Sequence, residues 1–118
     1  MLKTFLHAKI HRAAVTETDL DYEGSLGVDE DLMEAAGLKP FERVEVFNIT
    51  NGERFATYLI VKERGSRTIG VYGAAARLAK AGDRLIVVAY AVLAEDEIDG
   101  FAPRVVILNE KNEITSVD

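Results

Sequence analysis

The clearest fold signal in the chain is Arg43–Lys62, with the sequence RVEVFNITNGERFATYLIVK. Apolar and polar side chains alternate on both sides of Asn51-Gly52, which is the period of strands that bury one face. Asn-Gly is the strongest short hairpin signal, because both residues tolerate a positive φ. The stretch therefore predicts an antiparallel hairpin, with one strand over Arg43–Ile49 and the other over Glu53–Lys62.

The same alternation continues outward along the chain. Residues 3–16 place Leu6, Ala8 and Ile10 on one face of a strand, with charged and histidine side chains on the other. Three later segments predict further strands: Thr68–Val71, Arg84–Leu93 and Val105–Leu108. Of these, Arg84–Leu93 (RLIVVAYAVL) is apolar on both faces, which indicates a central strand.

Two short helices are predicted between the strands. Asp29 is a good N-cap for a helix over Glu30–Ala36, and Gly37 suits its C-terminal end. A second helix is expected over Ala74–Lys80, ended by Gly82. Six strands with two helical crossovers favour a mainly β fold closed into a small barrel, since closure removes exposed strand edges.

Length and composition describe one globular domain. The chain has 118 residues, of which 48% are hydrophobic and 29% charged, and no apolar run approaches the ~18 residues of a transmembrane helix. We expect no secretory signal and no membrane partner. The absence of cysteine suits a cytoplasmic protein. A net charge of −6 speaks against nucleic acid as a partner, because phosphate binding needs a basic face.

Few residues offer catalytic chemistry of a familiar pattern. His7 and His11 share a strand face, but no third ligand of the right type lies near them in sequence, so we expect no metal site. The glycines fit neither a phosphate-binding loop nor a dinucleotide fingerprint, and no serine lies in a nucleophile elbow.

The dipeptide Gly24-Ser25 is the exception. A serine hydroxyl can attack the unhindered carbonyl of a preceding glycine and convert the amide to an ester, and β-elimination followed by hydrolysis then leaves a pyruvoyl group. On local sequence alone, Gly-Ser is more often an ordinary turn. A second copy occurs at Gly65-Ser66, and the chemistry of the dipeptide does not choose between them.

Motifs along nearly the whole chain resemble the aspartate 1-decarboxylase family. They are Lys9-Ile10-His11-Arg12, Val15-Thr16, Asp19-Leu20, Tyr22-Glu23-Gly24-Ser25, Val28-Asp29, Thr50-Asn51-Gly52, Arg54, Thr57-Tyr58, Glu63-Arg64-Gly65-Ser66, Gly73-Ala74-Ala75-Ala76 and Gly82-Asp83. The resemblance implies a six-stranded double-psi β-barrel and a homotetramer of self-cleaved protomers. It also implies conversion of L-aspartate to β-alanine and CO₂ for pantothenate synthesis.

The resemblance assigns roles to individual residues. Cleavage between Gly24 and Ser25 would give the pieces 1–24 and 25–118, and Ser25 would become the pyruvoyl cofactor that forms a Schiff base with the substrate. Tyr58 would donate a proton to the α-carbon. The residues implied to contact substrate are Lys9, Arg54, Thr57, Gly73, Ala74 and Ala75, of which Thr57 also serves self-processing. On a straight strand, however, the Cα atoms of Arg54 and Tyr58 lie about 13 Å apart.

Tyr72 departs from the family pattern, which has Asn before the Gly73 position. If the pocket is otherwise conventional, Tyr72→Asn is expected to raise kcat/KM for aspartate, unless the tyrosine points away from the substrate. Two alternatives to the main interpretation stay open. One is a small β-barrel binding or regulatory module in which Gly24-Ser25 is an inert turn, and the other is a related decarboxylase whose substrate Tyr72 has changed.

Overall fold

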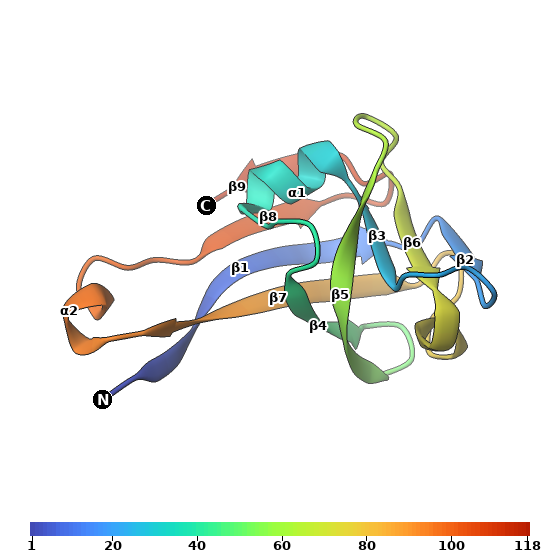
Figure 1. Ribbon diagram of the computed structural model, residues 1–118. Helices are drawn as coiled ribbons and strands as arrows, with labels where there is room; N and C mark the ends of the chain where they lie inside the picture. Colours follow the sequence, from blue (N-terminus) through green and yellow to red (C-terminus); the bar gives the residue numbers. More distant parts are fainter.

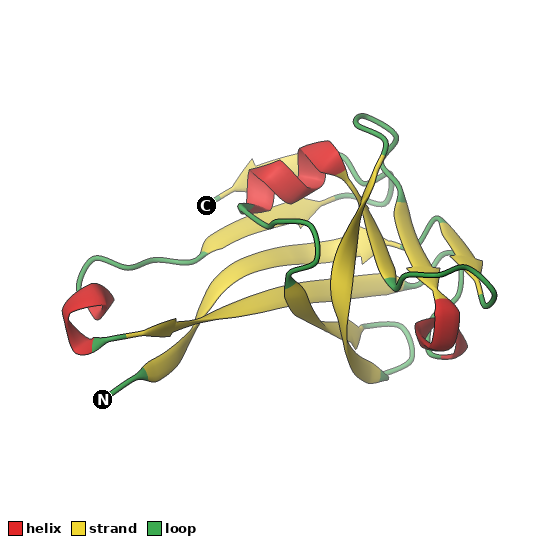
Figure 2. Ribbon diagram, in the orientation of Figure 1, coloured by secondary structure: helices red, strands yellow, loops and turns green.

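A computed structural model describes residues 1–118 and is mainly β, with roughly half of the residues in strands (Figures 1 and 2). The elements in chain order are β1 (Lys3–Ala14), β2 (Glu17–Asp19), β3 (Leu26–Asp29), α1 (Glu30–Ala36), β4 (Arg43–Asn48), β5 (Arg54–Lys62), β6 (Ile69–Tyr72), the 3₁₀ helix η1 (Gly73–Arg77), β7 (Arg84–Leu93), α2 (Glu95–Ile98), β8 (Arg104–Leu108) and β9 (Ile114–Val117). The six predicted strands are all present, and three short ones bring the number to nine.

Strand β5 joins two sets of paired strands. Its first half, Arg54–Tyr58, pairs antiparallel with β4, and its second half, Leu59–Lys62, pairs parallel with β3. The full order is β2-β6-β3-β5-β4-β7-β1-β8-β9, so the hydrogen-bonded pairing runs from β2 to β9 and does not itself close a barrel. Because β5 crosses from one set to the other, residues in its middle lie beside both (Figure 1).

The predicted hairpin forms, with a wider turn than a two-residue loop. β4 and β5 pair antiparallel, and the Asn48 N–H donates to the Glu53 carbonyl at 2.8 Å. Of Asn51 and Gly52, only Gly52 has a positive φ, 81°. The Asn48 side chain points inward, where its amide donates to the Asp83 carboxylate at 2.9 Å.

The core follows the predicted alternation. Ala8 and Ile10 on β1 are fully buried, and β7 lies between β1 and β4 in the middle of the strand order, as expected. The C-terminal end of β7 extends with the start of β1 and with α2 to one side of the molecule (Figure 1). Tyr90 and Val92 are exposed there, so this end of β7 is not covered on both faces.

Helix α1 begins and ends at the predicted residues. The Asp29 carboxylate accepts the Asp31 N–H at 2.8 Å, and Gly37 adopts the left-handed conformation at the C-terminal end. The second predicted helix is instead the short turn η1, since side-chain amides of Asn48 and Asn51 both donate to the Leu78 carbonyl and end the helix there. No helix in this fold is both long and apolar enough to span a membrane.

Candidate active site

A cavity of about 460 Å³ opens where the β2–β3 loop, the first half of β5 and η1 meet. Its lining residues are Gly24, Ser25, Phe55, Ala56, Thr57, Tyr58, Tyr72, Ala74, Ala75 and Leu78. Most of these side chains are apolar or small, so the hydroxyl groups among them stand out as the groups able to act on a bound molecule.

The backbone around Gly24 and Ser25 is closely held. The Tyr72 N–H donates to the Ser25 carbonyl at 2.8 Å. Gly24 has φ 114°, and a Cβ there would come within 2.9 Å of the Ile60 side chain. Gly73 has φ 65°, and a Cβ on it would lie 3.3 Å from the Gly24 carbonyl oxygen. Glycine at position 73 therefore lets η1 approach the Gly24-Ser25 peptide directly, and glycine at position 24 leaves space for the Ile60 side chain of β5.

The first half of β5 supplies the polar side of the cavity. Thr57 is half-buried, and Tyr58 is 43% exposed at the mouth. Arg54 lies on the same strand face as Tyr58, but its guanidinium stacks over the Phe47 ring at 4.7 Å and does not line the cavity. The strand thus brings Thr57 and Tyr58 to the Gly24-Ser25 peptide and leaves Arg54 outside.

Lys9 lies still farther from this cavity within one chain. It pairs with Val88 of β7 and Val105 of β8, and two strands, β7 and β4, separate its strand from β5. Lys9 is accordingly not among the residues that line this cavity, and its substrate contact stays a prediction from the resemblance.

The side chain of Tyr72 is turned to a polar partner. Its ring is 2% exposed, and its hydroxyl donates to the Glu17 carboxylate at 2.7 Å. Burial raises the pKa of Tyr72 well above its ordinary value, and the hydrogen bond with Glu17 raises the pKa further. The Tyr72 hydroxyl therefore stays protonated and hydrogen-bonded to Glu17. It does not take the place of the side-chain amide that the family pattern directs at a substrate.

Comparison with known protein families matches residues 1–115 to the family described as aspartate decarboxylase. This chain is a member of that family. An aspartate 1-decarboxylase of Phenylobacterium zucineum is 55% identical over 114 residues, 97% of this chain and 97% of the relative. One from Cupriavidus necator is 50% identical over 117 residues, 99% of this chain and 98% of the relative. One from Caulobacter vibrioides is 55% identical over 112 residues, 95% of each chain.

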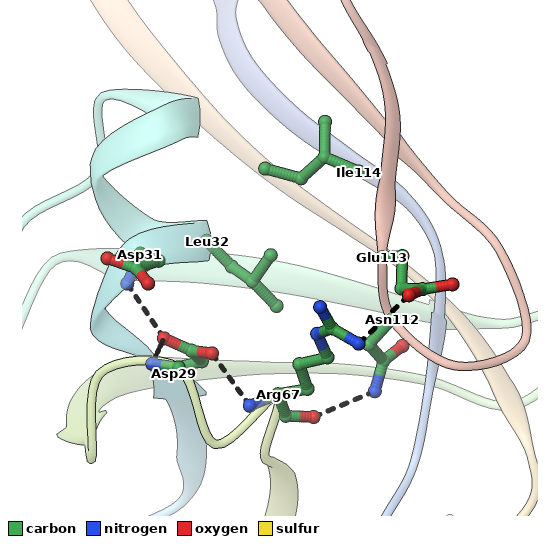
Figure 3. A pocket seen from close by; sticks show the side chains of 8 residues that line it. Asp29, Asp31, Leu32, Arg67, Asn112, Glu113 and Ile114 are labelled. Carbon is green, nitrogen blue, oxygen red and sulfur yellow. Dashed lines mark hydrogen bonds and ion pairs between the residues drawn. The ribbon is translucent and has the colours of Figure 1, made fainter.

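This family member has a second hollow, of about 400 Å³ (Figure 3). It is polar, and polar groups in it form hydrogen bonds with one another. The Asp29 carboxylate accepts backbone N–H groups of Asp31, Gly65 and Arg67 at 2.8, 3.1 and 2.7 Å. The buried Asn112 amide donates to the Arg67 carbonyl at 3.0 Å. These groups join α1 to the β5–β6 turn and the β8–β9 turn, which is a structural role.

The second hollow also separates the two Gly-Ser dipeptides. Gly65 lines it, and the Ser66 hydroxyl donates to the Glu63 carbonyl at 2.6 Å within the β5–β6 turn. Gly24-Ser25 instead lies beside Thr57 and Tyr58 in the first cavity. The tertiary structure thus distinguishes two dipeptides that local chemistry left equivalent.

Sequence reasoning missed the residues around Tyr72. Its ring contacts Tyr22, with centroids 4.6 Å apart, and the Lys62 ammonium lies 4.7 Å from its centroid. The available signal was Gly27 and Gly70, which interrupt apolar segments without marking turns. Glycine inside a strand often marks the close approach of another group.

Proposed function

We propose that this chain is a pyruvoyl-dependent L-aspartate α-decarboxylase that yields β-alanine and CO₂ after cutting itself between Gly24 and Ser25. The observation that carries the proposal is the common cavity of the Gly24-Ser25 peptide, Thr57 and Tyr58 in a member of the aspartate decarboxylase family. Formation of β-alanine would supply pantothenate synthesis. A cytoplasmic location belongs to the same proposal.

Self-cleavage starts at the Ser25 hydroxyl. Its oxygen attacks the Gly24 carbonyl carbon, and the amide nitrogen leaves that carbon, so the peptide becomes an ester with a free amine on residue 25. Removal of the α-proton of residue 25 expels the Gly24 carboxylate and leaves a dehydroalanine. Water then adds and ammonia departs, which produces the pyruvoyl group at the new N-terminus. The released pieces are 1–24 and 25–118.

The surroundings of Ser25 fit such a group. The Ser25 carbonyl, which stays on the larger piece, is already fixed by the Tyr72 N–H at 2.8 Å. Glycine at positions 24 and 73 lets Ile60 and η1 pack closely around this peptide without a side chain shielding the Gly24 carbonyl. When present, the pyruvoyl group supplies an electron sink for the electrons released as CO₂ leaves.

Protein side chains would do the remaining work. Tyr58 at the cavity mouth donates a proton to the α-carbon, and Thr57 beside it contacts the substrate and assists the cleavage. Ala74 and Ala75 line the cavity opposite β5, where small side chains leave space for aspartate. Gly73, which abuts the Gly24 carbonyl, completes the substrate side of η1.

Arg54 and Lys9 are proposed to bind the substrate carboxylates. Neither lines the cavity of its own chain, which favours an assembly of several copies. Arg54 lies on the Tyr58 face of β5 and reaches the cavity only by leaving the Phe47 ring. The strand of Lys9 lies two strands from β5 within one chain, so we expect Lys9 to enter the cavity of a neighbouring copy. This is a physical reason for the proposed homotetramer, and exposed apolar side chains such as Phe41 and Val92 offer surface to bury in it.

The double-psi β-barrel also belongs to the proposal. It is supported by β5, which pairs with β4 over one half and with β3 over the other and so serves two sets of strands. The strands of the parallel pairs β1·β8 and β3·β5 can be joined only by crossover connections, which such a barrel also has.

Intact-mass analysis tests self-cleavage. Warm incubation of the purified protein is expected to convert the chain into pieces 1–24 and 25–118, the larger without a free N-terminal amine. Ser25→Ala should stay whole, while Ser66→Ala should cleave as the wild type does. The cleaved protein should form β-alanine from L-aspartate. An uncut wild type, or a cut at Gly65-Ser66, would refute the proposal.

A further inference from the structure

The Tyr72 ring packs over two glycines, Gly27 and Gly70, which have no side chains to exclude it. Gly27 on β3 and Gly70 on β6 are direct partners in the antiparallel pairing. A Cβ on Gly70 would come within 2.0 Å of the Tyr72 hydroxyl oxygen, and a Cβ on Gly27 within 2.8 Å of the ring. Only glycine at both positions leaves space for the ring. The position of the ring therefore depends on Gly27 and Gly70 as well as on Tyr72 itself.

The Tyr72 ring also contacts the loop that carries the cleavage site. The rings of Tyr22 and Tyr72 have centroids 4.6 Å apart and are tilted by 41°. The Lys62 ammonium lies 4.6 Å from the Tyr22 centroid and 4.7 Å from the Tyr72 centroid. Glu17 holds the far end of Tyr72 through its hydroxyl at 2.7 Å. We call Glu17, Tyr22, Lys62 and Tyr72 the tyrosine clasp.

Tyr22 is two residues before Gly24, and its side chain is 44% exposed. Without the clasp, the segment between β2 and β3 would have few side-chain anchors to the body of the protein. Ordering a backbone segment costs conformational entropy. The aromatic pair and the cation beside both rings offset part of that cost for the residues just before Gly24-Ser25.

We propose that Tyr72 and Lys62 clasp the side chain of Tyr22 and thereby hold the Gly24-Ser25 peptide in the geometry for self-cleavage, which makes Tyr72 a positioning residue for maturation. The inference rests on the proposed function, because it concerns the rate of the same cleavage. Attack by a hydroxyl on a neighbouring carbonyl needs near-contact geometry, and loss of positioning lowers the rate steeply. None of the clasp side chains takes part in the reaction itself. They act by holding the segment that precedes the Gly24-Ser25 peptide.

The test measures the cleavage rate by intact mass after rapid cold purification. Tyr22→Leu is expected to slow cleavage about tenfold, equivalent to about 1.4 kcal/mol in the barrier. Tyr22→Phe keeps the ring and should stay within about twofold of the wild type, and Lys62→Met should slow cleavage about threefold. Once fully cleaved, Tyr22→Leu should have the kcat and KM of the wild type, because the clasp serves maturation.

Two controls separate positioning from folding. Tyr90 has the same exposed fraction as Tyr22, 44%, but lies on the end of β7, and Tyr90→Leu should cleave at the wild-type rate. In a Ser25→Ala background that cannot cut itself, Tyr22→Leu should lower the melting temperature no more than Tyr90→Leu does. Cleavage of the wild type with an unchanged rate in Tyr22→Leu would overturn the clasp. Equal slowing in Tyr90→Leu would overturn it too, whereas an uncut wild type would refute the proposed function itself.

Discussion

At the scale of single residues, Tyr72 is the side chain whose surroundings change an expectation from sequence. The family pattern led us to expect a gain in kcat/KM from Tyr72→Asn. In the structure, asparagine would leave the Glu17 carboxylate without its partner and the surface over Gly27 and Gly70 uncovered. The structural surroundings therefore lead us to expect the opposite effect.

Tyr72→Asn should lower the free energy of unfolding by about 3 kcal/mol, because it removes a buried ring and leaves a cavity. Self-cleavage should also slow, since the clasp loses its support. Urea denaturation and intact-mass kinetics measure the two effects. A stable variant with a higher kcat/KM for aspartate would show that the tyrosine is a handicap to the enzyme.

Tyr58 is the residue whose proposed chemical role is simplest to isolate. Tyr58→Phe keeps the ring and removes the hydroxyl, so cleavage should proceed while kcat falls by about 10²–10⁴-fold, the usual contribution of a positioned proton donor. Steady-state kinetics of the fully cleaved protein test this, with Tyr90→Phe as the control on another exposed tyrosine. Normal turnover in Tyr58→Phe would remove Tyr58 from the mechanism.

At the scale of elements, Asp29 joins α1 to the β5–β6 turn. Its buried carboxylate accepts three backbone N–H groups, from Asp31, Gly65 and Arg67. Its loss would remove the N-cap of the helix and leave backbone donors of the turn without partners (Figure 3).

Asp29→Ala should accordingly lower the free energy of unfolding by about 3 kcal/mol in urea denaturation. Asp31→Ala is the matched control. Asp31 forms only an exposed ion pair with Arg64, which contributes ~1 kcal/mol or less. Equal losses in the two variants would mean that the carboxylate at position 29 does not hold the turn.

At the scale of the whole molecule, the separation of Lys9 from its own cavity leads to a complementation experiment. Lys9→Ala and Ser25→Ala should each be inactive alone. Co-expression should restore part of the activity, since a mixed assembly contains an intact Ser25 next to an intact Lys9 from another copy. Light scattering should give about four times the 13.0 kDa chain mass.

The control for this experiment pairs Ser25→Ala with Tyr58→Phe. Both residues line the cavity of one chain, so no mixed site is complete and no activity should return. Recovery in the control, or none with Lys9→Ala, would mean that the site is divided between copies in some other way.

The pH dependence of stability also concerns the whole fold, through His11. Its Nδ1 is buried without a hydrogen-bond partner, and burial, with the nearby cations Lys9, Arg12 and Arg84, lowers the pKa of His11 from 6.5. The unfolded chain therefore binds this proton more readily than the folded one, and stability falls as the pH drops through 6.5.

His11→Asn should thus reduce the loss of melting temperature between pH 7.5 and pH 5.5. The comparison with wild type isolates His11, because the contact between His7 and Glu42 is present in both proteins. An identical loss in the variant would show that His11 is not the group that titrates.

The elements with strong local signals could be predicted from the residues alone. The β4–β5 hairpin, the central strand β7 and the bounds of α1 follow from alternation and helix capping, which depend on residues close together in the chain. The motifs along the chain also identified the family, whose match covers residues 1–115.

Features that depend on distant partners became visible only in the folded chain. The short strands β2, β3 and β9 were not predicted, and each forms by pairing with a strand distant in the sequence or across a turn. Which Gly-Ser dipeptide lies beside Thr57 and Tyr58, where the Tyr72 ring lies and how many strands separate Lys9 from β5 were likewise beyond the sequence. Each is fixed by contacts between residues tens of positions apart, and the folded backbone alone brings those residues together.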